Sequence, residues 1–239
     1  MALAPEQAHQ LRSVLRRSVG HAVTLFNGRD GEWSGHIATL GRNACEVSVT
    51  DRLRPQQAEI DLWLVFAPVK RAPLEYLLEK ATELGVSAFH PVMTRHTVIE
   101  RLNLDRLRAQ AREAAEQSER LTVPAIAAPQ PLDQLLAGWP PERRLILCDE
   151  TGTAPSLAAA LQAMTPAPLA VLTGPEGGFA ETELDALRKL PFVSPVGLGP
   201  RVLRSETAAL AAVAVVQALA GDWGAARARR ESAAAKAAR

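Results

Sequence analysis

Two glycine-rich stretches in the C-terminal half carry the residues best suited to chemistry. The first reads Gly-Pro-Glu-Gly-Gly-Phe at residues 174–179, and the second reads Gly-Leu-Gly-Pro-Arg at 197–201. Each follows a short apolar segment, 169–172 or 192–196, of the kind expected for strands buried in a parallel sheet. Glycine allows a loop to adopt positive φ and to present its N–H groups at close range. Because ligands of open α/β sheets bind beyond the carboxyl ends of the strands, the two loops predict a pocket for one small molecule.

Neither loop matches the common nucleotide-binding motifs. A P-loop requires Lys and then Ser or Thr after its last glycine, whereas Gly178 is followed by Phe179 and Ala180. A dinucleotide fingerprint requires a third small residue where the second loop has Val202. The loops are also poor in hydroxyls and lysine. A polyphosphate ligand is therefore disfavoured, whereas an adenosine-bearing ligand without phosphates fits.

Four ordered blocks of sequence resemble the RsmE family of SPOUT-class methyltransferases. Two are the glycine loops, the second extending as Leu-Gly-Pro-Arg-Val-Leu-Arg-Ser-Glu-Thr-Ala over 198–208. The others are Lys-Ala-Thr-Glu-Leu-Gly-Val at 80–86 and Glu-Ala-Ala-Glu-Gln-Ser at 113–118. The resemblance spans nearly the whole chain. It implies that the pocket holds S-adenosylmethionine and that the protein methylates N3 of a specific uridine of 16S ribosomal RNA, at the decoding-region site of the small ribosomal subunit.

The resemblance also implies an α/β fold with two domains and a tail. We expect a small PUA-like, RNA-binding β-barrel over residues 1–66 and a SPOUT methyltransferase domain over 67–222. The latter is a parallel-sheet domain with a deep trefoil knot, which spacing alone would not suggest because knots are rare. Residues 223–239 form a basic, Ala-rich tail.

The glycine loops and the helix after them supply the candidate cofactor-binding residues. These are Leu172, Thr173, Gly174, Gly177, Gly178, Gly197, Leu198, Gly199, Val202, Leu203, Thr207 and Ala208.

Three charged residues beside the loops are the catalytic candidates. Methylation at N3 removes a proton, so negative charge gathers on the uracil oxygens and favours nearby cations. Arg201 and Arg204 fit that role, although they could instead contact carboxylates or helix ends. Glu176 is either a general base or an acceptor for the N–H groups of a turn, which would make it a poor base.

Basic residues spread along the chain are candidates for RNA phosphate contacts, or else solvated surface charges. They are Arg12, Arg16, Lys70, Arg95 and Arg120. A further polar group, Glu113, Glu116 and Gln117, is either a solvated stripe of a helix or part of the active site.

The first domain reads as a short helix followed by antiparallel strands. The helix spans 5–17, with Ala8, Leu11, Val14 and Leu15 on its apolar face. Strands are expected over 22–26, 33–40 and 45–49. RsmE proteins usually carry a basic and aromatic strand before this helix, whereas this chain begins Met-Ala-Leu-Ala. We therefore expect that part of the RNA surface is absent or supplied otherwise.

The second domain alternates strands with helices, which predicts a parallel sheet covered on both faces. Strands are expected at 60–66, 86–92 and 145–148, and helices at 73–84, 103–118, from 131 and at 156–164. Gly85 and Asn103 are the expected caps of two of these helices.

The last helix, 205–220, predicts a homodimer. Ser205 is its expected N-cap, and almost no polar face is left along it. Such a helix is buried all round, with one side on the sheet and another free for a second subunit. SPOUT methyltransferases are similarly dimeric.

Composition limits the remaining possibilities. The 239 residues are 47% hydrophobic with a net charge of +1, so any nucleic-acid surface depends on clustering of cations. The two cysteines, Cys45 and Cys148, lie far apart, and the five histidines show no ligand spacing, so we expect no metal. No segment is long and apolar enough for a membrane span, and a reducing cytoplasm fits.

Two other functions stay open from the sequence. The same fold could methylate a ribose 2′-O or another base. A non-catalytic RNA-binding or assembly protein is the second alternative, against which the intact glycine loops and Arg204 weigh.

Overall fold

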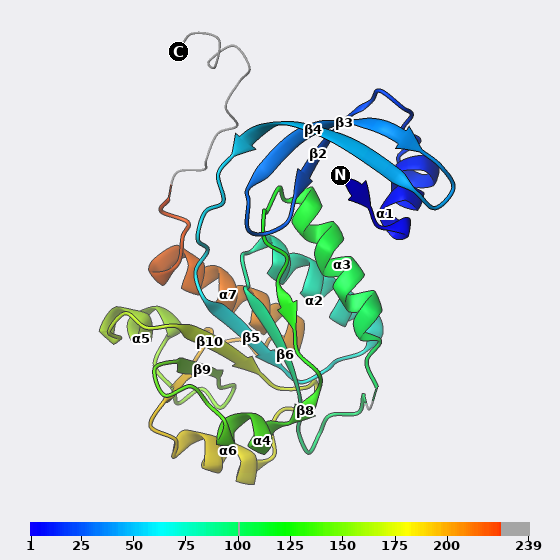
Figure 1. Ribbon diagram of the computed structural model, residues 1–239. Coiled ribbons are helices and arrows are strands. Elements are labelled where there is room, and N and C mark those ends of the chain that lie inside the picture. Colours follow the sequence, from blue (N-terminus) through cyan, green and yellow to red (C-terminus); the bar gives the residue numbers. More distant parts are fainter. Residues whose placement is uncertain (100, 226–239) are drawn as a thin grey trace. The chain divides into compact units, whose positions relative to one another are not determined.

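The computed structural model describes residues 1–99 and 101–225, which divide into two compact units (Figure 1). The first unit is Met1–Ala58, and the second begins at Glu59. The predicted basic tail lies outside the described residues from position 226 onward.

The first unit is a four-stranded antiparallel sheet that curls into an open half-barrel (Figure 1). Its strands are β1 (Ala2–Leu3), β2 (Ala22–Phe26), β3 (Glu32–Leu40) and β4 (Cys45–Arg54), in the order β1-β4-β3-β2. Helix α1 (Pro5–His9) covers the sheet and buries Ala8 in a small core with Ile37 and Val47. The predicted strands and their antiparallel pairing are confirmed.

The opening helix differs from its prediction. After α1 the chain forms a π-helical turn, η1 (Gln10–Val14), in place of further α-helix. A π-turn holds more residues than an α-turn, so it rotates the residues after it away from the original face. Val14 and Leu15 are accordingly 67% and 51% exposed, while Leu11 still packs against the core. The single apolar face expected through Leu15 is therefore wrong.

A two-residue strand, β1, precedes the opening helix. In β1, Ala2 pairs with Glu46 and Leu3 with Cys45, both on β4. The backbone of an N-terminal strand is present, but its side chains are neither basic nor aromatic.

The second unit contains a parallel sheet of seven strands. Six run in the order β11-β9-β10-β5-β6-β7, and β8 pairs with β6. Their bounds are β5 Leu62–Phe66, β6 Ala88–Met93, β7 Ala125–Ile126, β8 Gln130–Pro131, β9 Arg144–Cys148, β10 Leu169–Thr173 and β11 Val193–Val196. Strand β5 ends at residue 66, so the predicted first domain extends through a strand that belongs to this second unit.

Helices cover both faces of the parallel sheet (Figure 1). Their bounds are α2 Arg71–Glu83, α3 Leu104–Gln117, α4 Leu132–Ala137, α5 Leu157–Ala163, α6 Glu181–Arg188 and α7 Ser205–Ala220. Helices α2, α3, α5 and α7 pack on the face that Leu169 and Val171 of β10 point to. Helices α4 and α6 cover the face of Ala170 and Leu172. The whole of β10 is buried, as its continuous apolar sequence predicts. The trefoil knot stays a prediction.

Local capping signals locate most of these helices correctly. The Asn103 side chain accepts a hydrogen bond from the Arg106 N–H at 3.0 Å at the start of α3. Gly85 follows α2 with φ of +93°, the left-handed conformation that glycine tolerates. Ser205, however, is not the cap of α7. Arg204 holds that position, and the Ser205 hydroxyl donates instead to the Gly174 carbonyl at 2.5 Å.

Helix α7 is buried on one face, not all round. Ala209, Ala212, Val213 and Val216 are fully buried in the described part of the chain. Leu219 is 51% exposed. Within the described residues, Leu219 is thus left largely uncovered. None of the described helices is both long and apolar enough to traverse a bilayer.

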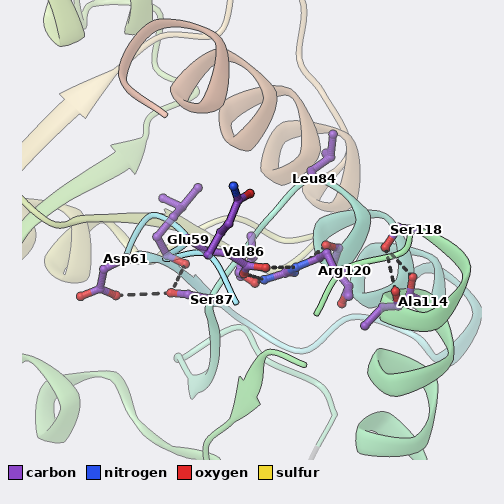
Figure 2. A network of polar contacts seen from close by, with 12 residues as sticks. Glu59, Asp61, Leu84, Val86, Ser87, Ala114, Ser118 and Arg120 are labelled. Carbon is purple, nitrogen blue, oxygen red and sulfur yellow. Dashed lines mark hydrogen bonds and ion pairs between the residues drawn. The ribbon is translucent and has the colours of Figure 1, made fainter. Parts of the chain in front are cut away.

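Arg120 lies inside the fold, where it holds the end of α2 (Figure 2). Its guanidinium donates to the Thr82 carbonyl at 2.6 Å and to the Val86 carbonyl at 3.0 Å, and it forms an ion pair with Glu59. The Arg120 side chain is only 10% exposed. Arg120 is therefore part of the protein interior. The prediction that it contacts RNA phosphate as an exposed residue is wrong.

A second buried charge, Arg143, lies among aromatic rings near the amino ends of the strands. It donates to the Leu169 carbonyl at 2.9 Å and lies 3.7 Å from the centre of the Trp63 ring. The ring of His90 also stacks on Trp63, with its centre 4.2 Å from that of the Trp63 ring. Burial, reinforced by the positive charge of Arg143 and opposed by Asp61, lowers the pKa of His90 to about 4.

Replacing Arg120 tests its structural role. We expect Arg120→Ala to lower the free energy of unfolding by about 3 kcal/mol, because it leaves Glu59 and two carbonyls without their buried partner. Arg112→Ala, at an exposed position of α3, is the matched control and should change stability by less than about 0.5 kcal/mol. Denaturant unfolding gives both values. Weakened RNA binding by a fully stable Arg120→Ala protein would contradict this assignment.

His90 predicts a specific pH dependence of stability. The folded state holds the ring neutral down to about pH 4, whereas the unfolded chain protonates it near pH 6.5. Protons therefore favour the unfolded chain, and the free energy of unfolding should fall as the pH drops from about 6.5 to about 4. His90→Phe keeps the stacking and should flatten this fall. Unfolding midpoints of the two proteins across that range provide the test, and parallel curves would refute it.

Candidate functional site

A cavity of about 560 Å³ lies in the second unit at the carboxyl ends of β9, β10 and β11. Both glycine loops line it, as does the first turn of α7. Its volume is within the range of about 300–1,000 Å³ that is usual for small-molecule sites. The pocket predicted from the two loops is therefore present in the structure.

The first loop turns tightly against a neighbouring segment. The Gly178 N–H donates to the Pro175 carbonyl at 2.9 Å, and Gly178 has φ of +69°. A Cβ added to Gly178 would lie 2.6 Å from Glu150 Oε1. The positive φ favours glycine at this position, whereas the exposed Glu150 side chain could move aside for a Cβ. At the start of the loop, the Ser205 hydroxyl holds the Gly174 carbonyl.

The second loop is fixed where it begins and exposed beyond. Gly197 donates to the Pro155 carbonyl at 2.8 Å and accepts from the Leu157 N–H at 3.1 Å, which forms a short parallel bridge. The chain then passes through Gly199, whose φ is +101°, to the exposed residues Arg201 and Arg204.

A third loop, 149–152, also lines the cavity, and sequence reasoning missed it. Asp149 is buried, accepts from the Thr151 N–H at 2.9 Å and forms an ion pair with Arg188 at 2.6 Å. Burial alone would raise the pKa of the Asp149 carboxyl, but the hydrogen bonds from Arg188 and Thr151 outweigh it and lower the pKa. This anchor places Glu150 at the cavity. An Asp-Glu-Thr-Gly run directly after a predicted strand was the available signal.

One cysteine lies at the cavity wall. Burial raises the pKa of the Cys148 thiol to about 12, so it is uncharged at neutral pH. A neutral thiol is a poor nucleophile, which disfavours a covalent cysteine mechanism here.

Most of the expected cofactor residues lie together around this cavity. Those that line it are Thr173, Gly174, Gly178, Gly197, Leu198, Gly199, Val202, Leu203 and Ala208. Three others do not appear in its lining. Leu172 is buried in the sheet, Gly177 lies against His96, and Thr207 is exposed on α7.

All three catalytic candidates line the cavity, together with Lys70. Arg201 and Arg204 are exposed there, one on the second loop and the other at the N-cap of α7. Glu176 Oε1 accepts a hydrogen bond from the Lys70 N–H at 3.3 Å. Glu176 thus accepts a main-chain N–H, which is the alternative that the sequence left open beside a role as general base.

The expected RNA contacts are divided between the two units. Arg12 and Arg16 are exposed in the first unit, whereas Lys70 and Arg95 are exposed in the second. Arg120 is withdrawn from this set by its burial. Glu113, Glu116 and Gln117 are on α3 and do not line the cavity. Among the described residues, no group of three His, Cys, Asp or Glu side chains is arranged to hold a metal ion.

Family models match both units of the chain. A model described as "RNA methyltransferase domain" matches residues 56–217, and one described as "RNA methyltransferase PUA domain" matches residues 3–50. The first of these covers the cavity and all three of its loops.

Named relatives and solved structures agree with these matches. The chain is 32% identical to ribosomal RNA small subunit methyltransferase E of Rickettsia conorii, over 88% of this chain and 86% of that protein. It is 33% identical to the protein of the same name from Synechocystis, over 92% and 73% of the two chains.

Among structures, the Neisseria gonorrhoeae protein of that name, bound to S-adenosyl methionine, has 27% identity and a TM-score of 0.78 over 93% of both chains. A methyltransferase of Legionella pneumophila in complex with the cofactor SAM has 28% identity and a TM-score of 0.79, also over 93% of both chains. On the strength of the matched models, the named relatives and the shared fold, the chain belongs to the RsmE family of ribosomal RNA small subunit methyltransferases.

Proposed function

We propose that this protein is an S-adenosylmethionine-dependent methyltransferase that acts on N3 of a specific uridine of 16S ribosomal RNA in the small ribosomal subunit. The observation that carries the proposal is the cavity between the two glycine loops, in a chain of the RsmE family. The N3 specificity rests on the family resemblance.

The residues around the cavity fit S-adenosylmethionine. The volume of about 560 Å³ suits a ligand of nucleoside size, and the loops present main-chain groups to it. The loops lack the Lys-Ser or Lys-Thr pair that would hold a polyphosphate. Two structural relatives at 27% and 28% identity hold this cofactor. When bound, it supplies a methyl group on a sulfonium centre, ready for in-line displacement.

The protein's part in the reaction is to position the uracil and stabilise charge on it. N3 lies on the Watson–Crick edge, so the target base must be unpaired or flipped out. As N3 loses its proton, negative charge spreads onto the uracil oxygens. Arg204 and Arg201 extend from the cavity rim, and the first turn of α7 adds the positive end of a helix dipole. We assign these two arginines to the uracil oxygens.

Glu176 has a narrower role in this proposal. One of its oxygens accepts the Lys70 N–H, so the carboxylate joins the first glycine loop to the start of α2. We therefore keep Glu176 as a site residue that orders the loop, with proton removal as its less favoured role.

RNA binding is proposed for exposed cations of both units. Arg12 and Arg16 lie in the unit that matches a PUA model, and Lys70 and Arg95 lie in the methyltransferase unit. Contacts to phosphate position the RNA without reading its sequence. The ribosomal substrate places the protein in the cytoplasm.

A homodimer is the proposed assembly. Leu219 is 51% exposed on α7, and Leu210 and Val215 are only partly covered. We take these partly uncovered apolar residues of α7 as the proposed interaction surface. The occupant we propose is the same helix of a second copy, because its small residues allow two helices to approach closely.

Methyl transfer tests the function directly. 16S RNA from cells that lack the protein is incubated with S-adenosylmethionine and purified protein, and nucleosides are identified by mass spectrometry. We expect 3-methyluridine at one site. Another methylated nucleoside would change the target but keep the enzyme class. No transfer to naked RNA or to assembled small subunits would favour a non-catalytic RNA-binding or assembly protein.

Arg204 is tested in the same assay. We expect Arg204→Ala to lower kcat about 100-fold, because it removes a donor aimed at charge that develops in the reaction, with cofactor affinity unchanged. Arg204→Lys keeps the charge without the planar donors and should be intermediate. Arg108→Ala, on the exposed side of α3, is the control. Equal activity of Arg204→Ala and wild type would remove Arg204 from the mechanism.

Light scattering tests the assembly. Wild type should have twice the 25.6 kDa mass of the chain. Leu219→Arg should shift the protein toward the monomer, because it places a charge on the proposed helix contact. Val49→Arg changes an apolar residue of similar exposure in the first unit and should stay dimeric. A monomeric wild type would disprove the dimer.

A further inference from the structure

A histidine to which the sequence assigned no role lies against the first glycine loop. His96 follows β6, and its Nδ1 is 3.2 Å from both the Gly177 and the Gly178 carbonyl oxygens. Both oxygens can only accept, so Nδ1 must carry a proton and donate to them.

His96 contacts the loop without lining the cavity. Gly178 and its neighbours Glu176 and Phe179 line the cavity, whereas Gly177 and His96 do not. A Cβ added to Gly177 would lie 3.5 Å from the Cβ of His96, so the two segments lie close together. The imidazole thus contacts, from outside the cavity, a loop that lines the cavity.

The segment that carries His96 is itself fixed in place. Thr94 and Thr97 close it as a turn, with the Thr94 N–H donating to the Thr97 hydroxyl at 2.9 Å. The Arg95 N–H donates to Glu183 Oε1 at 2.9 Å. The other oxygen of Glu183 accepts the Ala180 N–H, also at 2.9 Å, at the start of α6. One carboxylate therefore joins the turn to the residue that immediately follows the glycine loop.

We propose that His96 is a positioning residue that, with Glu183, holds the 174–179 loop in the conformation that binds S-adenosylmethionine. This inference rests on the proposed function for the identity of the ligand. The loop contains three glycines, which lose the most conformational freedom when they are ordered. Bonds that order the loop in advance reduce the entropy lost on binding and so increase affinity.

The test separates a positioning donor from an acid or base. In the full chain, His96→Asn places an amide N–H close to where Nδ1 lies and should restore the bond. His96→Gln extends its amide past that point, and His96→Ala removes it. Val98→Ala, at an 82% exposed position two residues on, is the matched control.

Calorimetry with S-adenosylmethionine gives the first measurement. Loss of one hydrogen bond of about 1 kcal/mol predicts a Kd about fivefold higher for His96→Ala and His96→Gln. His96→Asn and Val98→Ala should stay within about twofold of wild type. At saturating cofactor, kcat of all four should be nearly unchanged. A loss of kcat in His96→Asn with normal affinity would instead make His96 an acid or base and overturn the proposal.

Hydrogen exchange gives a measurement that does not depend on the ligand. Without cofactor, His96→Ala should speed amide exchange of the peptide covering 174–180, and His96→Asn should not. Unchanged exchange in His96→Ala would overturn the proposal whatever the affinities. If wild type fails to bind S-adenosylmethionine but the exchange result holds, the proposed function falls while the positioning role of His96 stands.

Discussion

Three loops line the cavity, two of them rich in glycine, and glycine-rich main chain keeps a single conformation only where other parts of the molecule hold it. Each of the three loops has such a partner. The Ser205 hydroxyl and the His96 ring donate hydrogen bonds to carbonyls of the first loop. In the second loop, the Pro155 carbonyl accepts a hydrogen bond from the Gly197 N–H. In the third, Arg188 forms an ion pair with Asp149. The site therefore depends on groups that have no part in the chemistry.

Features that depend on near neighbours in sequence were predictable. The apolar run of β10 and the Asn103 cap of α3 are set within a few residues of themselves, and both appear as expected. Parallel strands put their following loops at one edge of the sheet, so the position of the pocket also followed from the pattern. The glycine loops that line it were identified for the same reason.

Features that depend on distant partners were not predictable. Ser205 has the sequence context of an N-cap, but it gives its hydroxyl to a carbonyl 31 positions away. Arg120 has the appearance of a surface cation, but Glu59 and the end of α2 enclose it. His96 gains its contact from a loop 81 positions later. In each case the residue type was compatible with several roles, and only the tertiary partner decided among them. The π-turn at η1 departs from the α-helical period, and the sequence shows no marker for this departure.

The left-handed conformation of Gly178 has a consequence for inhibitors of this site. A compound that bonds to the main chain of the first loop meets a position where the φ of +69° would strain any side chain. A single substitution does not remove a backbone carbonyl, and only a change to proline removes a backbone N–H. Resistance through loss of a main-chain contact is therefore open to fewer substitutions than resistance through loss of a side-chain contact.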